Sequence, residues 1–182
     1  MEDSEIKKAI NRIEKNIDVK ETGSKVKKHT RPPWDEYFMQ ITELVAKRST
    51  CLRRSTASLL VKNRQILATG YNGPPKGVPH CGEKGGCLRE KLGVPSGQRQ
   101  ELCRAAHGES NCIAQAAAHG VKTEGATLYS LTFPCVFCIK MLINAGIKKI
   151  VFKDDYGSTE DYKLARELVE EAGIEVVRFQ PS

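Results

Sequence analysis

The sequence predicts an α/β fold in which a mixed sheet of about five strands lies between helices, in a three-layer α/β/α arrangement. Amphipathic helical segments alternate with short apolar runs across residues 33–179. Two of these runs follow each other directly, with a short polar turn between them, which is typical of a β-hairpin. We therefore expect the element order α-α-β-β-α-β-α-β-α-β.

The chain of 182 residues is long enough for one domain with its own core and a short extension. We assign residues 1–32 to an N-terminal helical extension with a basic linker, and residues 33–182 to the domain. Within the extension, residues 3–18 carry an apolar stripe at helical spacing, which predicts a helix that packs on the domain or on another subunit. Nucleic-acid or membrane binding by this helix is the alternative. The stripe consists of Ile6, Ile10, Ile13 and Ile17.

The first helix of the domain is expected over residues 33–48, because Pro32 and Pro33 are favourable at a helix start. Its apolar residues recur at helical spacing and are expected in the core. They are Trp34, Phe38, Ile41, Leu44 and Val45. The hairpin follows, with strands predicted at Thr56–Val61 and Gln65–Thr69.

The run Gly70–Gly77 is rich in glycine and proline and predicts a structured turn that brings the backbone close to a neighbour. Asn72 either forms this turn with its own side chain or directs its amide into a pocket, and turn chemistry alone favours the first. A long loop is expected over residues 79–104. The later elements are predicted as a helix at 107–118, a strand at 126–131, a helix ending near Asn144, a strand at 149–152, a helix from Ser158 and Asp161 to Ala172, and a strand at 174–179.

The composition indicates which cellular compartment and which kinds of partner to expect. No apolar run approaches the ~20 residues of a membrane span, and the charged N-terminus has no apolar signal-peptide core. We therefore expect a cytoplasmic protein with no membrane partner. The net charge of +7 suits a phosphorylated substrate as well as weak nucleic-acid contact. In the cytoplasm, seven cysteines indicate metal binding or catalysis rather than disulfides.

Cys135 and Cys138 indicate half of a metal site. They stand at the predicted start of a helix, where residues three apart point the same way and the unpaired N–H groups favour thiolates. His107 supplies the third donor, and a catalytic zinc site takes three protein ligands and keeps a fourth position for water. Glu109, two residues after His107, is then the acid and base beside that water. A closed structural zinc knuckle is the alternative, and it needs a fourth ligand such as Cys112.

A second group of metal donors lies in the long loop and at the end of the helix before it. Four or five soft donors in one region match a closed, structural zinc site that would fold a loop with few apolar residues. Reduced thiols without a metal are the alternative. The candidate ligands are Cys51, His80, Cys81, Cys87 and Cys103.

At these residues the chain resembles the deoxycytidylate deaminase branch of the zinc-dependent cytidine deaminase family. The resemblance covers roughly residues 34–179 and includes the signature H-x-E…P-C-x-x-C. It further includes RSTC at Arg48–Cys51, ATGYNGPPKG at Ala68–Gly77 and INAGIKKIVF at Ile143–Phe152. Two departures are Gly108, where the family usually has alanine, and Thr56-Ala57-Ser58, where it usually has valine-glycine-alanine.

The resemblance implies a fold, a reaction and several roles. It implies a cytidine deaminase-like fold, His107, Cys135 and Cys138 as zinc ligands, and Glu109 as the catalytic acid and base. Asn72 matches an asparagine that contacts substrate near the sugar, and Tyr156 matches a tyrosine near the substrate phosphate in phage relatives. Positions matching Cys51 and Cys81 hold a second zinc in those relatives.

The resemblance also implies a homo-oligomer, with deoxycytidine triphosphate and thymidine triphosphate as effectors in many members. Mg²⁺ would accompany such a triphosphate. The expected reaction is the hydrolysis of deoxycytidine monophosphate (dCMP) to deoxyuridine monophosphate (dUMP) and ammonia, which supplies thymidylate synthesis. Alternatives are a deaminase of cytidine, of a riboflavin-pathway aminopyrimidine or of a tRNA base, and a non-catalytic zinc module that binds nucleic acid. The low aromatic content, 6%, disfavours nucleic acid as a partner.

Overall fold

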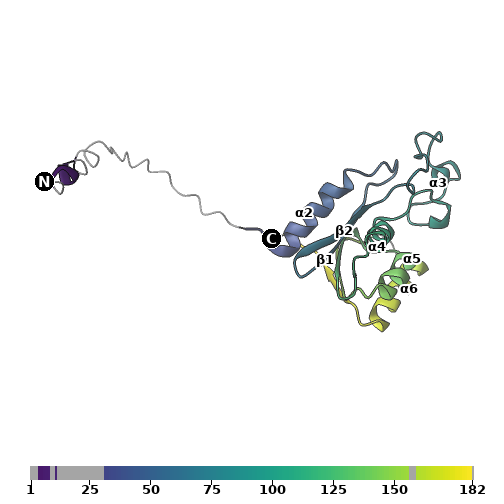
Figure 1. Ribbon diagram of the computed structural model, residues 1–182. Helices are drawn as coiled ribbons and strands as arrows, with labels where there is room; N and C mark the ends of the chain where they lie inside the picture. The colour runs from purple at the N-terminus through teal and green to yellow at the C-terminus, as the bar shows by residue number, and fades with distance from the viewer. Residues whose placement is uncertain (1–3, 9–10, 12–30, 156–158, 182) are drawn as a thin grey trace. The chain divides into compact units, whose positions relative to one another are not determined.

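The protein is represented by a computed structural model that describes residues 4–8, 11, 31–155 and 159–181 (Figure 1). The chain divides into a unit of residues 1–31 and a unit of residues 32–182. In the first unit, residues 4–8 are helical and exposed. The rest of the predicted isoleucine stripe, Ile10, Ile13 and Ile17, lies outside the described residues.

The second unit is built on a five-stranded sheet with the order β2-β1-β3-β4-β5. The β1–β2 and β1–β3 pairs are antiparallel, whereas β3, β4 and β5 run parallel. The predicted α/β class with a mixed sheet of five strands is therefore confirmed. The strands are β1 (Ala57–Lys62), β2 (Gln65–Tyr71), β3 (Thr127–Thr132), β4 (Lys149–Asp154) and β5 (Glu175–Arg178).

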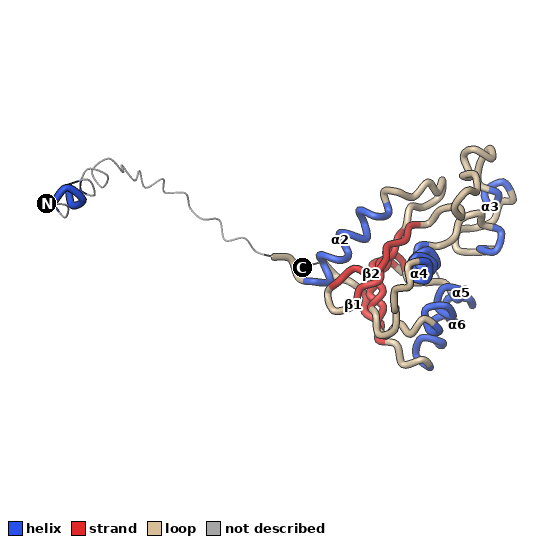
Figure 2. The backbone as a smooth tube through the Cα atoms, in the orientation of Figure 1, coloured by secondary structure: helices blue, strands red, loops and turns tan. Residues whose placement is uncertain are grey.

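Helices cover both faces of the sheet (Figures 1 and 2). One face carries α2 (Trp34–Ala46), and a small core forms there from Phe38, Met39 and the strand residues that point toward them. The opposite face carries the larger core beneath three helices. These are α4 (Gly108–Ala118), α5 (Val136–Asn144) and α6 (Glu160–Glu171). None of the described helices combines the length and the apolar composition that crossing a membrane requires.

Two residues of α2 that were predicted to be in the core are not there. Trp34 is 48% exposed and Leu44 is 62% exposed, because the sheet covers only one stripe of the helix. Trp34 instead stacks on Phe38, and the guanidinium of Arg64 lies over its ring. The buried stripe consists of Phe38, Met39, Thr42 and Ala46.

Four chain segments meet at one edge of the sheet, where β1 begins and β2, β3 and β4 end. β1 runs opposite to its neighbours, so its start lies beside the ends of β2 and β3: Ala57 pairs with Tyr71, and Ser58 pairs with Ser130. The segments before β1 and after β2, β3 and β4 therefore meet there. Open α/β sheets bind ligands at such edges, outside the carboxyl ends of their parallel strands. The loop of residues 79–104 also reaches this edge and contains α3 (Leu88–Lys91) and a 3₁₀ turn at Gln100–Leu102.

Candidate active site

Three predicted metal donors meet where two helices begin. His107 directly precedes α4, Cys135 directly precedes α5, and Cys138 lies in the first turn of α5. The Nδ1 atom of His107 lies 3.4 Å from the Sγ atom of Cys135 and 3.5 Å from that of Cys138. The three potential ligand atoms lie within 4.8 Å of one another, which suits a tetrahedral zinc site with bonds of ~2.0–2.3 Å.

The protonation of these side chains also fits a metal. The pKa of Cys135 is lowered to about 4, because the Cys138 thiol donates a hydrogen bond to it and His107 lies beside it. The same hydrogen bond, together with burial, raises the pKa of Cys138. Burial opposes the charged form of His107, but its hydrogen bond with Cys135 and the charge of Glu109 raise its pKa. One favoured thiolate, a second thiol and an imidazole form a donor set that zinc binds with release of protons.

Glu109 lies beside the three donors without belonging to the donor set. Glu109 is 4% exposed and lines a cleft that His107 and Cys135 also line. Its Oε2 atom lies 3.7 Å from the Sγ atom of Cys138. Burial raises its pKa, since desolvation disfavours the carboxylate. A buried carboxyl whose pKa is raised suits proton uptake and release next to a metal site.

Two buried serines hold Glu109 in place, and neither was singled out from the sequence. The hydroxyl of Ser130 donates to Oε1 of Glu109 at 3.2 Å, and its oxygen lies 3.0 Å from the hydroxyl oxygen of Ser58. Both serines are fully buried. The signal that could have found them is the cross-strand pair itself, since Ser58 departs from the usual family alanine and faces Ser130 in register.

Cys112 is a core residue. Its thiol is fully buried and donates to the backbone oxygen of Ser58 at 3.0 Å. Burial raises its pKa well above the usual range. It does not join His107, Cys135 and Cys138, so the closed-knuckle alternative loses its suggested fourth ligand.

Helix α4 packs directly on the backbone of the hairpin. A Cβ atom added at Gly108 would lie 2.9 Å from the backbone oxygen of Gly70 and 3.1 Å from Ala57, and one added at Gly70 would lie 2.2 Å from the backbone oxygen of Gly108. Gly108 therefore occupies a position where this chain has no room for the usual family alanine. This close approach fixes the start of α4, which carries His107 and Glu109, against the sheet.

Asn72 lines the cleft, and its side chain organises the segment before β1. Its Nδ2 group donates to the backbone oxygen of Arg54 at 2.9 Å, and its Oδ1 atom accepts from the backbone N–H of Thr56 at 2.9 Å and from the hydroxyl of Ser49. An amide NH₂ group has two N–H donors, so one remains available for a ligand. Tyr156, the other predicted substrate contact, lies outside the described residues.

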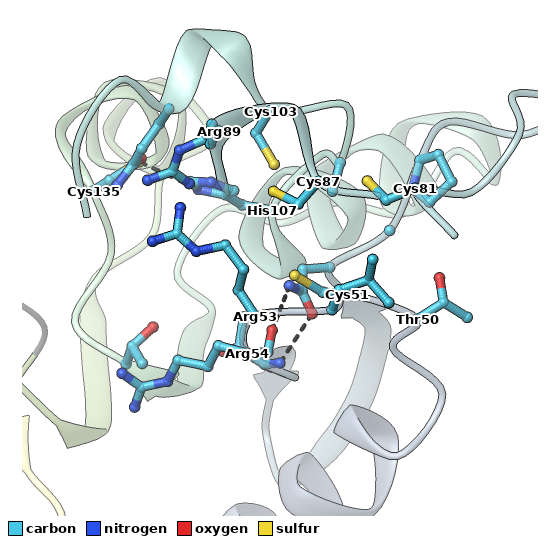
Figure 3. Close-up of a pocket in the computed structure, with 18 of the residues that line it drawn as sticks. Thr50, Cys51, Arg53, Arg54, Cys81, Cys87, Arg89, Cys103, His107 and Cys135 are labelled. Atoms are coloured by element: carbon cyan, nitrogen blue, oxygen red, sulfur yellow. Dashed lines mark hydrogen bonds between the residues drawn. The ribbon is translucent and has the colours of Figure 1, made fainter. Parts of the chain in front are cut away.

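The four cysteines proposed for the second metal site line the same cleft (Figure 3). They are Cys51, Cys81, Cys87 and Cys103. Burial and the neighbouring thiols of Cys87, Cys103 and Cys51 raise the pKa of Cys81, so the other three cysteines lie near it. Their spacing is wider than that of the catalytic donors: among the described residues, His107, Cys135 and Cys138 form the one group within 4.8 Å. The Nδ1 atom of His80 lies 2.5 Å from the Thr50 hydroxyl, and His80 does not line the cleft.

The cleft is partly open to solvent, and the segments that meet at this edge of the sheet line it. Several buried polar atoms that face it have no hydrogen-bond partner among the described residues, which indicates a polar ligand. They are Nη1 of Arg53, Oγ1 of Thr56, Nε of Arg89 and Oε1 of Gln100. Sequence reasoning gave none of these four side chains a binding role, although Arg53 lies only two residues after Cys51.

An α/β/α domain with a histidine and two cysteines at two helix starts, beside a buried glutamate, has the architecture of a zinc-dependent deaminase. Residues 32–154 match the cytidine and deoxycytidylate deaminase zinc-binding region, and the chain belongs to this family. The resemblance drawn from the motifs is thereby confirmed, and the family supports zinc as the metal of the three-donor site.

Named relatives fall in the same family. The chain is 39% identical over 150 residues to ComE operon protein 2 of Bacillus subtilis (strain 168), covering 82% of this chain and 73% of that protein. It is 35% identical over 151 residues to deoxycytidylate deaminase of Schizosaccharomyces pombe, covering 83% of this chain but 45% of the relative. The chain thus spans about half the length of that relative.

A solved structure with the same fold is that of dCMP deaminase from the cyanophage S-TIM5 in complex with dCMP and dUMP. It superimposes with a TM-score of 0.67 at 29% identity, over 83% of this chain and 100% of the phage chain. The predicted cytidine deaminase-like arrangement is therefore confirmed.

The packing of α4 predicts that Gly108→Ala destabilises the protein. The added methyl group collides with backbone atoms that cannot rotate away, and overpacking of this kind costs about 1–3 kcal/mol. Thermal or denaturant unfolding measures the loss. Gly82→Ala is the matched control, since an added Cβ there meets no atom within 4 Å and its φ is not positive. Equal stability of the two variants would contradict the packing argument.

Proposed function

We propose that this protein hydrolyses dCMP to dUMP with release of ammonia, and so supplies dUMP for thymidylate synthesis. The observation that carries the proposal is the buried Glu109 carboxyl beside His107, Cys135 and Cys138, next to a cleft that Glu109, His107 and Cys135 line. The choice of substrate is supported by relatives named deoxycytidylate deaminase and by the phage structure that contains dCMP and dUMP.

The chemistry follows from the side chains that surround the cleft. Zinc held by the three donors would supply a Lewis acid that lowers the pKa of a water molecule toward neutrality. Glu109 accepts one proton from the attacking water and delivers it to N3 of the pyrimidine while the oxygen bonds to C4. Glu109 then carries the second water proton to the 4-amino group. The C4–N bond breaks, ammonia leaves, and the ring becomes uracil.

The substrate contacts are part of the proposal. We assign the free N–H of the Asn72 amide to the sugar end of the nucleotide and Tyr156 to the region of its phosphate, as the family resemblance implies. Arg53 supports a phosphate there, because its buried Nη1 atom lacks a partner and guanidinium groups bind phosphate well.

We also propose a second, structural zinc bound by Cys51, Cys81, Cys87 and Cys103. Four cysteines are a complete ligand set for a closed zinc site. The effect of the other three thiols on the pKa of Cys81 supports that set. His80 was a further candidate ligand, but its contact with Thr50 favours the all-cysteine set. The metal would fold a loop that has few apolar residues of its own.

The remaining expectations stay predictions: a homo-oligomer, deoxycytidine and thymidine triphosphate effectors with Mg²⁺, a cytoplasmic location, and the division into residues 1–32 and 33–182.

The proposed reaction predicts that the protein releases ammonia from dCMP and that Glu109→Gln abolishes this activity without loss of zinc. The amide cannot shuttle the proton, and such proton transfer contributes ~10²–10⁴-fold to the rate. Ammonia release from dCMP, CMP, deoxycytidine and cytidine would be compared, with zinc content measured in parallel. The exposed Glu124→Gln variant is the control. Full activity of Glu109→Gln would exclude the assigned role, and silence of the wild type toward all four compounds would exclude the reaction.

The hydrogen bond from Ser130 predicts a shift in the pH profile. This bond favours the Glu109 carboxylate and lowers a pKa that burial raises. Ser130→Ala removes it, so the pKa of Glu109 rises further and the acid limb of the kcat/KM profile moves to higher pH. Loss of a hydrogen bond to a charged group predicts ~10–100-fold lower kcat/KM near neutrality. Ser58→Ala, which acts through Ser130, should give a smaller shift of the same sign. An unchanged profile in Ser130→Ala would contradict the role of Ser130.

The second metal site predicts the zinc content of three proteins. The wild type should contain two zinc ions per chain, Cys81→Ser one, and His80→Ala two, as measured by elemental analysis of the purified proteins. Cys81→Ser should also unfold more readily, because structural zinc contributes folding free energy. Loss of one zinc from His80→Ala, or two zinc ions retained in Cys81→Ser, would overturn the all-cysteine assignment.

A further inference from the structure

Arg89 in α3 is buried, although arginine side chains usually lie at the protein surface. The four-residue helix Leu88–Lys91 lies in the long loop, yet its leucine is exposed and its arginine is buried. Leu88 is 44% exposed, whereas Arg89 is 8% exposed and lines the cleft. This inverts the usual preference of the two residue types and indicates that the arginine is held inside for a reason other than loop packing.

The guanidinium of Arg89 contains a buried N–H group that is not satisfied. One Nη2 hydrogen bond reaches the backbone oxygen of Pro95 at 3.3 Å, and the buried Nε atom has no partner. In the part of the chain that the structure describes, Arg89 forms no ion pair. Burying a guanidinium with an unpartnered N–H group is costly, and a bound anion would offset that cost.

A second arginine faces the same cleft. Arg53 comes from the segment before β1, and its Nη1 atom is also buried and unpartnered. Figure 3 shows the guanidinium groups of Arg53 and Arg89 directed into the cleft near His107 and Cys135. Neighbouring Arg54 is different, since it is paired with Asp154.

We propose that Arg89 is a specificity residue that binds the dianionic phosphate monoester of the nucleotide, opposite Arg53. Two guanidiniums from separate segments can bracket one phosphate with several charge-assisted hydrogen bonds. The loop of residues 79–104 thereby makes the cleft select nucleotides over nucleosides. This inference rests on the proposed deaminase function, which it extends to the choice of substrate class.

The test compares Arg89→Gln with the wild type on paired ligands that differ only in the phosphate. KM is measured for dCMP and for deoxycytidine, and titration calorimetry measures Kd for the products dUMP and deoxyuridine. Arg99→Gln is the matched control, since Arg99 lies in the same loop, is exposed and does not line the cleft. Arg89→Lys keeps a positive charge without the planar fork and reports on loop integrity together with zinc content and the unfolding midpoint.

We expect Arg89→Gln to raise KM for dCMP and Kd for dUMP by ~10–100-fold, the range for one lost charge-assisted bond, with kcat nearly unchanged. Deoxycytidine and deoxyuridine should be unaffected, Arg99→Gln should match the wild type, and Arg89→Lys should fall between. Equal effects on nucleotide and nucleoside, or no effect on dUMP binding, would overturn the assignment. Arg89-dependent dUMP binding without any turnover of dCMP would instead reject the reaction and retain the phosphate site.

Discussion

The close contact between α4 and the β1–β2 hairpin is the constraint on which the site depends. Gly108 and Gly70 bring two backbones together at a distance that leaves no space for a Cβ atom on either residue. His107 and Glu109 flank Gly108, so this contact sets how far both side chains lie from the sheet. The Ser58–Ser130 pair can reach Glu109 only because the helix is held this near.

The same constraint explains how one buried carboxyl combines a raised pKa with a fixed orientation. Full exposure would leave Glu109 with an ordinary pKa, and burial without a partner would keep it permanently protonated. Here burial raises the pKa while Ser130 and the charge of His107 restrain the rise. The Oε1 atom is held by Ser130, and Oε2 lies on the side of Cys138. Orientation and pKa therefore come from the same few contacts.

The sequence predicted those parts of the site that depend on local spacing. The order of the longer helices and strands, the hairpin and the donors His107, Cys135 and Cys138 follow from patterns within a few residues, and family motifs reinforced them. The short helix α3 and the 3₁₀ turn, inside the predicted loop, were missed. Ser130, Arg53 and Arg89 were missed because their roles depend on strand register and loop packing between distant segments. Leu44 illustrates the same limit, since helical spacing shows which residues share a stripe but not how wide a stripe the sheet covers.

The loop of residues 79–104 contributes side chains to the cleft, and something other than apolar packing must fix the conformation of this loop. Residues 79–104 are mostly polar and have little apolar surface to bury, so donors that bind a metal are the physical means available to fix them. Cys87 directly precedes α3, and Arg89 is the second residue of that helix. A metal ion that fixed Cys87 would therefore also fix the backbone from which Arg89 enters the cleft. In the proposed arrangement, the structural metal site and substrate selection would depend on one short helix, whereas the proposed zinc ligands and Glu109 lie at the starts of α4 and α5.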